Sequence, residues 1–375
     1  MRLLLSLGIG ALFIWFVVAK FDFGAVFSLS YAYRLDGATL SVLKPTGGIA
    51  WSLDLVTLLP VIAIVVLIHF IKVWRWELML KPLGRFGFSE VNAVSAVGFM
   101  SILLFPLRLG EFVRPYLIAA RNPKTSMSEV MATIVVERVV DGLTTAFFLV
   151  GALYFLPKGA GREFALLETG SYIALAIFSA LVLMILLAWW RIELVCRILD
   201  LTVGLVSQKL AAFAKQVLRA FFDGLAKLPD VGMIVGFIVW TALYWGVNGV
   251  AIWWLAKGFG VELSLFGGYV LMCTLVIGIM IPGPPGQAGN FEAAILLPLA
   301  LFSPNTPVAN GAFTLMLHAI FLIQPTLFGL YFIVRGKIRM RRVWESTKSD
   351  GGAPPGATIG DPGAYSGTKQ PVVGE

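Results

Sequence analysis

The chain has 375 residues, a mean hydropathy of +0.87, 58% hydrophobic residues and only 13% charged residues. This composition lies outside the range of soluble domains and predicts a polytopic membrane protein. The apolar runs are continuous over about 20 residues, which favours membrane-spanning helices over the alternating strands of a barrel. The net charge of +8 fits loop charges attracted to anionic lipid headgroups, so it does not indicate a nucleic-acid partner.

In chain order, the apolar runs predict about six full spans and two broken segments. The full spans lie near residues 3–18, 55–74, 128–156, 171–190, 231–256 and 309–334, and the broken segments are 90–120 and 264–302. The first run lacks a small-x-small cleavage site, so we expect an uncleaved anchor rather than a signal peptide.

Both broken segments contain the pattern Pro-x-x-x-Gly-(Glu/Gln), at Pro106 to Glu111 and at Pro282 to Gln287. Proline and glycine interrupt a helix, and bare backbone is tolerated at membrane depth only where protein or a water-filled cavity satisfies it. A matched pair of such breaks indicates a transport site. Each segment is either a re-entrant hairpin or a pair of ordinary spans, and the charge pattern does not separate these two alternatives.

Basic residues follow the second, fourth and last spans, and the positive-inside rule predicts that all three groups are cytoplasmic. The groups are Lys72, Arg75, Lys81 and Arg85; Arg191 and Arg197; and the arginines and lysine between Arg335 and Arg342. With two re-entrant segments, both termini are cytoplasmic and the hairpins enter from opposite sides. The predicted fold is therefore an all-α polytopic membrane protein with two re-entrant hairpins in an inverted repeat.

Two peripheral segments complete the organisation. Residues 203–228 have apolar residues at helical spacing and basic residues on the other faces, which predicts an amphipathic helix on the cytoplasmic leaflet. The alternative is a helix packed on the protein itself. Residues 343–375 are rich in Gly and Pro and predict a disordered cytoplasmic tail, which leaves 1–342 as the transmembrane domain.

Ionisable residues within apolar sequence are costly, so they are the candidates for a binding site. Arg108, Glu111 and Arg114 recur every three residues after the first break, and a half-helix beginning near Pro106 presents them along one side. Two guanidinium groups beside a helix N-terminus suit a phosphate or a carboxylate, and Gly110 provides a backbone donor and hinge. The alternative is an interfacial salt-bridge trio that fixes the hairpin.

A second group of charges lies within the span at 128–156. Glu137 and Asp141 are four residues apart and share one helix face, and Arg138 either bridges to Glu111 or serves as their counter-ion. A direct substrate contact and a structural ion-pair network are both consistent with this spacing.

In the second half, Glu292 and His318 are the only acidic or basic side chains between residues 263 and 334. Glu292 follows the second break, whose backbone donors and hinges are Gly286, Gln287, Gly289 and Asn290. Proton coupling and a hydrogen-bonded structural role remain equal alternatives for this glutamate. His318 is either a site residue or a satisfied core histidine.

Motifs for soluble chemistry are absent. The sequence has no Walker phosphate loop, Gly-x-Ser-x-Gly elbow, His-Glu-x-x-His motif or Cys-x-x-Cys pair. We therefore expect no ATP hydrolysis, no cofactor, no metal and no catalytic residue. Cys196 and Cys273 are expected to be buried, inert thiols.

Four motifs together resemble those of the lysylphosphatidylglycerol synthase transmembrane region family, which is also called the flippase-like domain. They are Lys72 to Leu80, Pro106 to Pro115, Glu137 to Asp141 and Ile281 to Glu292. The resemblance covers most of residues 1–340. The family includes the membrane half of the bacterial multiple peptide resistance factor, which flips aminoacylated phosphatidylglycerol, and stand-alone members linked to hopanoid, glycolipid and polysaccharide pathways.

This resemblance implies a lipid flippase or facilitator of a bacterial inner membrane, without aminoacyl-transferase activity. The expected substrates are an anionic phospholipid, an aminoacylated lipid, a hopanoid or a glycolipid, and lipid-biosynthesis enzymes are possible partners. Two other classes stay open. One is a membrane-embedded glycosyl or headgroup transferase with Glu111, Asp141 or Glu292 as general base; the other is a scaffold subunit of a biosynthetic complex.

Overall fold

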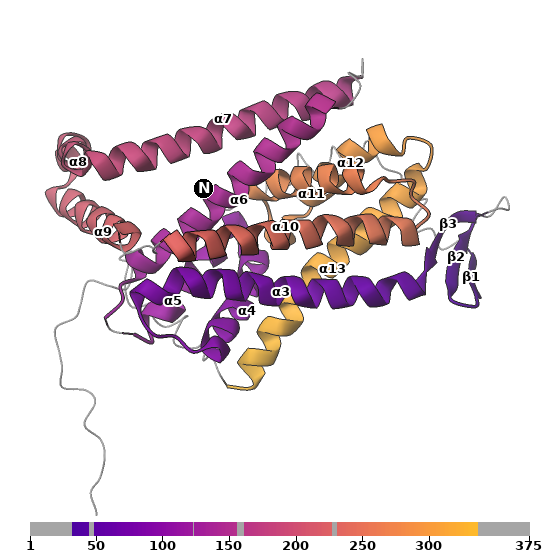
Figure 1. Ribbon diagram of the computed structural model, residues 1–375, viewed down its shortest axis with the longest axis horizontal. Helices are drawn as coiled ribbons and strands as arrows, with labels where there is room; N and C mark the ends of the chain where they lie inside the picture. Colours follow the sequence, from indigo (N-terminus) through magenta and orange to yellow (C-terminus); the bar gives the residue numbers. More distant parts are fainter. Residues whose placement is uncertain (1–31, 45–48, 123, 156–160, 227–230, 337–375) are drawn as a thin grey trace, which may run out of the picture. The chain divides into compact units, whose positions relative to one another are not determined.

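The computed structural model describes residues 32–44, 49–122, 124–155, 161–226 and 231–336 (Figure 1). The span predicted at 3–18 and the tail predicted at 343–375 lie outside these residues. Eleven α-helices and one three-stranded sheet occur in the described parts of the chain. The predicted class, an all-α polytopic membrane protein, is confirmed, with a small sheet added to it.

The elements follow one another in a simple order. The strands are β1 (Ala32–Asp36), β2 (Thr39–Leu43) and β3 (Ile49–Asp54). The α-helices are α3 (Leu58–Leu80), α4 (Phe88–Leu104), α5 (Val113–Ala119), α6 (Met127–Phe155), α7 (Arg162–Trp190), α8 (Ile192–Val206), α9 (Gln208–Ala226), α10 (Val231–Gly258), α11 (Leu265–Met280), α12 (Asn290–Phe302) and α13 (Pro307–Val334). Short 3-10 helices are η1 (Leu55–Thr57), η2 (Lys81–Leu83), η3 (Pro106–Phe112) and η4 (Pro285–Gln287).

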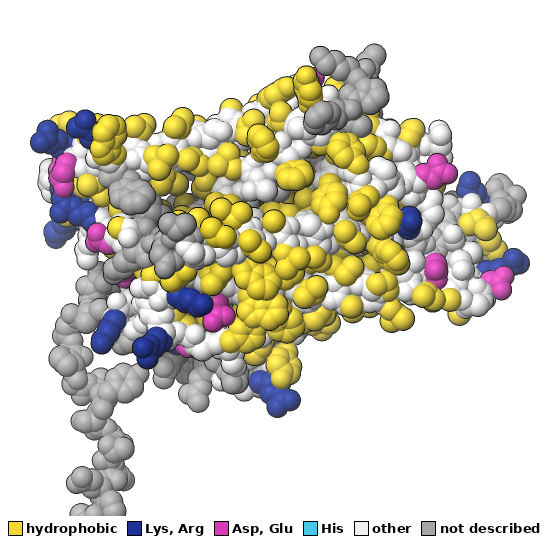
Figure 2. All heavy atoms as spheres, in the orientation of Figure 1, with side chains coloured by type: hydrophobic (Ala, Val, Ile, Leu, Met, Phe, Trp, Pro, Cys, Tyr) yellow, Lys and Arg dark blue, Asp and Glu magenta, His cyan; other side chains and the backbone are white. Residues whose placement is uncertain are grey.

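Four helical segments are long and apolar enough to cross a membrane, and they match four of the predicted spans. They are Leu55–Leu83, Arg162–Ala188, Gly232–Gly258 and Pro307–Val334. Figure 2 shows hydrophobic side chains over the middle of the visible surface and Lys and Arg side chains gathered toward its ends. Apolar side chains exposed in this way fit a lipid environment.

The predicted span at 128–156 coincides with α6, which has 29 residues but is not among the four candidate spans. Helices α4 and α11 have 17 and 16 residues. At a rise of about 1.5 Å per residue they reach about 25 Å, less than the roughly 30 Å of a hydrocarbon core. Their lengths favour re-entrant hairpins over full spans, and the re-entrant arrangement stays a prediction.

The packing repeats itself when α3 to α6 are exchanged with α10 to α13. Helix α3 packs along α10; α4 packs on α13 as α11 packs on α6; and each short returning helix, α5 or α12, packs on the long helix that follows it. Gly258 at the end of α10 lies against Thr57 just before α3, so the two related helices run antiparallel (Figure 1). This is the packing expected of an inverted repeat.

The three-stranded sheet was not among the elements predicted from the sequence. Strand β2 pairs antiparallel with both neighbours, and Asp36 lies opposite Thr39 across a tight turn in which Gly37 has φ = 57°. Asp-Gly between alternating residues is a strong hairpin signal. Leu53 of β3 is buried in the core near the end of α10, and Trp51 packs its ring 5.7 Å from that of Phe259.

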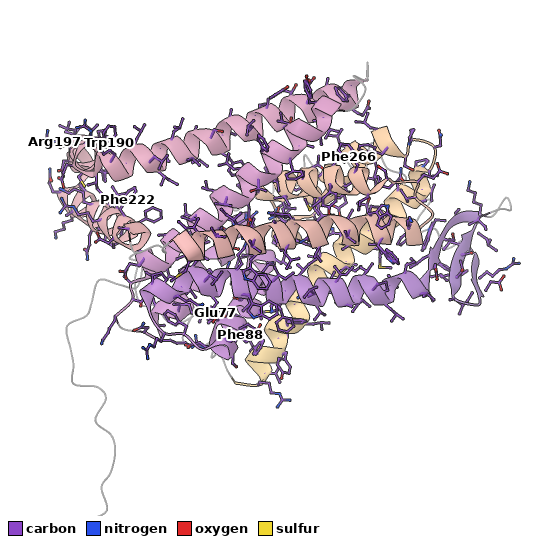
Figure 3. All side chains as sticks on the ribbon, viewed as in Figure 1. Glu77, Phe88, Trp190, Arg197, Phe222 and Phe266 are labelled. Carbon is purple, nitrogen blue, oxygen red and sulfur yellow. The ribbon has the colours of Figure 1, made fainter. Side chains whose placement is uncertain are left out.

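The prediction of one amphipathic helix over 203–228 is wrong in its boundaries. Ser207 has an extended conformation that ends α8, and its hydroxyl accepts a hydrogen bond from the Leu210 amide at the start of α9. The two helices are joined by ion pairs between Lys215 and Asp200 (2.6 Å) and between Arg219 and Glu193 (3.4 Å). Helix α9 packs on α6. Figure 3 shows Trp190 and Arg197 near the start of α8.

The antiparallel pairing of α3 with α10 predicts a specific cross-link. A Cβ atom built on Gly258 would lie 3.0 Å from the Cβ of Thr57. The Thr57→Cys/Gly258→Cys double variant should therefore form a disulfide on mild oxidation, seen as a mobility shift that a reductant reverses. Thr57→Cys paired with Gly151→Cys on α6 is the matched control, and equal cross-linking of both pairs would contradict this packing.

Candidate functional site

The first break, which the 3-10 helix η3 occupies, packs tightly against the preceding helix α4. A Cβ atom on Gly110 would overlap the backbone of Ser101 and Ile102 in α4, so only glycine fits there. Arg108 has φ = 58°, a left-handed conformation that is strained for a residue with a side chain. Its guanidinium donates to Glu111 through Nε at 2.8 Å and Nη2 at 2.5 Å, and Nη1 donates to the Ile279 carbonyl at 2.5 Å. Arg108 therefore ties the first break to the end of α11.

The second break is closed by its own side chains. Gly286 and Gln287 have φ values of 73° and 60°, and Gln287 is buried. In the part of the chain that the structure describes, Arg108 and Gln287 are the non-glycine residues with positive φ, one in each break. The Asn290 amide donates to the Ile281 carbonyl at 3.0 Å and to Gln287 at 3.4 Å.

Three contacts that join Gly289, Glu292, His318 and Gly286 hold the second break against α13, and we call these four residues the clasp. Glu292 accepts a hydrogen bond from the Gly289 amide at 2.7 Å, and its other oxygen lies 2.5 Å from Nδ1 of His318. Nε2 of His318 lies 2.8 Å from the Gly286 carbonyl, and its ring stacks on Phe291. Both ring nitrogens thus face acceptor oxygens, so the Glu292–His318 pair must hold two protons to satisfy both contacts.

A buried charge cluster lies where α3, α5, α6 and α10 meet. Arg75 of α3 donates to both oxygens of Asp141 (2.6 and 2.9 Å), to Glu137 (2.8 Å) and to Thr241 of α10 (3.4 Å). The side chains of Arg75 and Glu137 are each only 1% exposed. Charges buried at this depth are stable only when paired and hydrogen-bonded.

Arg75 is the site residue that the sequence reading missed, because it was counted with Lys72 as a cytoplasmic loop charge. Their placement in a loop is wrong, whereas the cytoplasmic side predicted for them stays a prediction. They lie within α3, with Arg75 paired to α6 and the Lys72 ammonium 3.6 Å from the centre of the Phe99 ring. The available signal was the pair of acidic residues in α6, which needed a cation from another apolar helix.

Arg114 of α5 joins the same cluster but is poorly satisfied. Its guanidinium lies 4.0 Å from the Trp76 ring and 4.9 Å from the Phe99 ring, and Nη1 donates to Glu137 at 3.3 Å. Gly98 leaves space for its methylene groups, which a Cβ atom there would overlap. The side chain is 1% exposed, yet its Nε and Nη2 have no hydrogen-bond partner.

Arg138 lies at the open edge of the cluster. Its guanidinium is 2.9 Å from Glu137 and 3.7 Å from Asp141, and the side chain is 29% exposed. It serves as a counter-ion in the cluster, while Glu111 pairs with Arg108 instead. Three guanidinium groups, on Arg75, Arg114 and Arg138, thus share two carboxylates, an excess of one positive charge.

The predicted single row of Arg108, Glu111 and Arg114 does not form. Residues 106–112 are a 3-10 helix and α5 begins only at Val113. The left-handed Arg108 turns its side chain toward α11, whereas Arg114 is buried against α6. The predicted site residues therefore form two groups. One group consists of Arg114, Glu137, Arg138 and Asp141. The other consists of Gly286, Gln287, Gly289, Asn290, Glu292 and His318. Arg108 connects the first break to α11.

Broken helices in two related halves and a buried cluster of charges define a polytopic helical membrane protein with a polar site inside its bundle. The family model described as Lysylphosphatidylglycerol synthase TM region matches residues 3–329. The chain belongs to this family, which indicates a membrane lipid-related function. Comparisons with curated proteins and with solved structures gave no match.

The unequal bonding of two arginines predicts unequal costs of replacing them. Arg75→Gln should destabilise the protein by about 3–5 kcal/mol, because it leaves two buried carboxylates without their main partner. Arg114→Gln should cost much less, since Arg114 makes one long bond to Glu137. Thermal unfolding in detergent measures both, with the exposed Arg34→Gln on β1 as control. Equal losses for Arg75→Gln and Arg114→Gln would contradict the assignment of Arg75 as the centre of the cluster.

The clasp at the second break predicts that charge matters less there than hydrogen bonding. In Glu292→Gln the new amide can donate to Nδ1 of a neutral His318 and still accept from Gly289, so stability should stay near that of the parent. His318→Ala should cost about 1–3 kcal/mol, because it leaves buried acceptors unpaired. The same unfolding measurement separates them, and a large loss in Glu292→Gln would show that an ion pair is required.

Proposed function

We propose that the protein is a flippase or facilitator that moves an anionic or modified lipid headgroup across the membrane. One observation carries the proposal: three buried or half-buried guanidinium groups share two carboxylates, and one of them, Arg114, lies in the helix that directly follows the first break. An uncompensated positive charge in an apolar bundle is unfavourable, and an anionic phosphate would balance it.

The two breaks supply the path in this proposal. A headgroup that crosses a bilayer must exchange water for protein groups, while its acyl chains stay in hydrocarbon. Arg138 is the most exposed cation of the cluster and makes the first contact with the phosphate. Arg114, whose Nε and Nη2 are unpartnered, holds it deeper in the bundle. Without a Walker motif in the sequence, movement is downhill or coupled to an ion.

The bonding of the carboxylates favours transport over a transferase reaction. Glu111 pairs with Arg108, Asp141 with Arg75, and Glu292 with His318 and the Gly289 amide. Both oxygens of Asp141 and both oxygens of Glu292 are hydrogen-bonded, which disfavours these two residues as a general base. Glu111 is bonded to Arg108 through Oε1 and is the base that the transferase alternative retains.

The family supports a membrane setting for this activity, and the finer points of that setting belong to the same proposal. We place the protein in a bacterial inner membrane with both termini cytoplasmic. The substrates are an anionic phospholipid, an aminoacylated lipid, a hopanoid or a glycolipid. Lipid-biosynthesis enzymes are the partners that would supply or consume such a lipid.

Movement of a fluorescent phosphatidylglycerol in liposomes that contain the purified protein tests the proposal. A quencher outside the vesicles should remove more than half of the label when the protein is present. Arg138→Gln and Arg114→Gln should slow this movement at least tenfold, because each removes a phosphate ligand. Arg34→Gln, an exposed arginine far along the chain from the cluster, is the matched control.

Two results would count against the proposal. Quenching that stops at half for every anionic lipid tried would mean that the protein moves none of them. Equal rates in the parent and in both arginine variants would mean that translocation does not use this cluster.

A further inference from the structure

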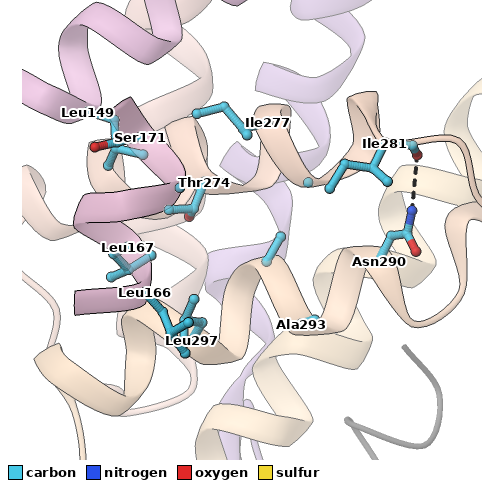
Figure 4. Close-up of a pocket in the computed structure, with 13 residues that line it drawn as sticks. Leu149, Leu166, Leu167, Ser171, Thr274, Ile277, Ile281, Asn290, Ala293 and Leu297 are labelled. Atoms are coloured by element: carbon cyan, nitrogen blue, oxygen red, sulfur yellow. Dashed lines mark hydrogen bonds between the residues drawn. The ribbon is translucent and has the colours of Figure 1, made fainter. Parts of the chain in front are cut away.

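A cavity of about 570 Å³ lies between the helix pair α11 and α12 and the long helices α6 and α7 (Figure 4). This volume falls within the roughly 300–1,000 Å³ range of ligand pockets. Its walls are Leu149 of α6; Leu166, Leu167, Gly170 and Ser171 of α7; and residues of α11 and α12 from Thr274 to Leu297.

The lining of the cavity is almost entirely apolar. The Ser171 hydroxyl donates to the Glu168 carbonyl at 2.7 Å, and the Thr274 hydroxyl donates to the Val270 and Leu271 carbonyls. Both hydroxyls are thus consumed by their own helices. The exception is Asn290, 1% exposed, whose amide nitrogen is bonded to Ile281 but whose Oδ1 has no partner (Figure 4).

The wall of the cavity is linked to the polar site through α11 and Asn290. Ile277, Gly278 and Ile281 line it, and the carbonyl of Ile279, within the same stretch, accepts the hydrogen bond from Arg108. Asn290 is the first residue of α12, immediately after the second break. The cavity wall thus carries an unpartnered acceptor, which suits a hydroxyl or ammonium donor of a headgroup, and the wall helix α11 is bonded by the cation Arg108, which suits a phosphate.

We propose that this cavity holds one acyl chain of the anionic lipid whose headgroup lies at the two breaks. The inference rests on the proposed function for the identity of the lipid, but the binding of the chain is separate from its movement. The headgroup phosphate meets Arg108, a headgroup hydroxyl donates to Asn290 Oδ1, and the hydrocarbon lies along α7 and α12. The cavity thereby keeps one tail in an apolar setting beside the polar path.

Gly170 provides a substitution that fills the cavity without a collision. It lines the cavity from α7, and a Cβ atom built on it meets nothing within 4 Å. Gly246 of α10 is the matched control: it lines a second cavity of about 330 Å³ and is equally open. Gly170→Phe and Gly246→Phe thus add the same ring at two unobstructed glycines, and only the first occupies the proposed tail site.

The experiment is photolabelling of the full chain in nanodiscs with a phosphatidylglycerol that carries a diazirine in one acyl chain. Peptide mapping should find label on residues 162–171 of α7 and 293–297 of α12 at several times the yield on the exposed face of α3. Gly170→Phe should lower this labelling at least fivefold, while Gly246→Phe and the small Gly170→Ala leave it near the parent value. Thermal unfolding of each variant checks that it is folded.

The outcomes distinguish the inference from the proposed function. Cavity labelling that is no higher than on α3, or that Gly170→Phe does not reduce, would overturn the tail site. Cross-links from this chain's own residues 3–18 to α7 or α12 would overturn it too, and would assign the cavity to that segment. Full labelling without any translocation in liposomes would instead leave the tail site standing and remove the flippase activity.

Discussion

The pairing of Arg75 with two carboxylates of α6 is the constraint on which the first half of the bundle depends. Arg75, Glu137 and Asp141 are almost completely buried, and ions at such depth are tolerated only with their partners in place. Because Thr241 of α10 also bonds Arg75, the cluster fixes three long helices relative to one another. Arg114 then attaches α5, and with it the first break, through Glu137.

The second half meets the same constraint with fewer charges. In both repeats the short returning helix is tied to the long helix after it, by Arg114 to Glu137 in the first and by Glu292 to His318 in the second. The second clasp also uses a backbone carbonyl, that of Gly286. The excess positive charge is therefore confined to the first half, which makes the molecule electrostatically asymmetric although its helices pack in related pairs.

Hydropathy and helix-breaking residues predicted the long helices, the two breaks and the relation between the halves, because burial in lipid leaves a strong one-dimensional signal. The residues from Glu137 to Asp141 were selected for the same reason. Arg75 was missed because a charge near the end of an apolar run has the same sequence signature whether it faces water or a buried carboxylate. The sheet of β1 to β3 was missed although Asp36-Gly37 is a strong hairpin signal, because a search for long apolar runs does not register strands of five or six residues. The Arg108 to Ile279 contact joins residues 171 positions apart and no local pattern encodes it.

Under the proposed function, that contact would also couple the two breaks to the occupancy of the site. The Ile279 carbonyl lies in the last turn of α11, where carbonyls lack helical partners, and Arg108 satisfies it. A phosphate that recruits Arg108 leaves this carbonyl to another donor, at a cost of about 1–3 kcal/mol if none replaces it. The same phosphate relieves the unbalanced charge of the cluster. Binding of the proposed anion would thus strengthen one half of the site and loosen the contact between η3 and α11, and by linkage a separation of these two segments would favour binding of the anion. A bond that closes the path in the absence of ligand is, on this argument, the bond that the ligand competes for.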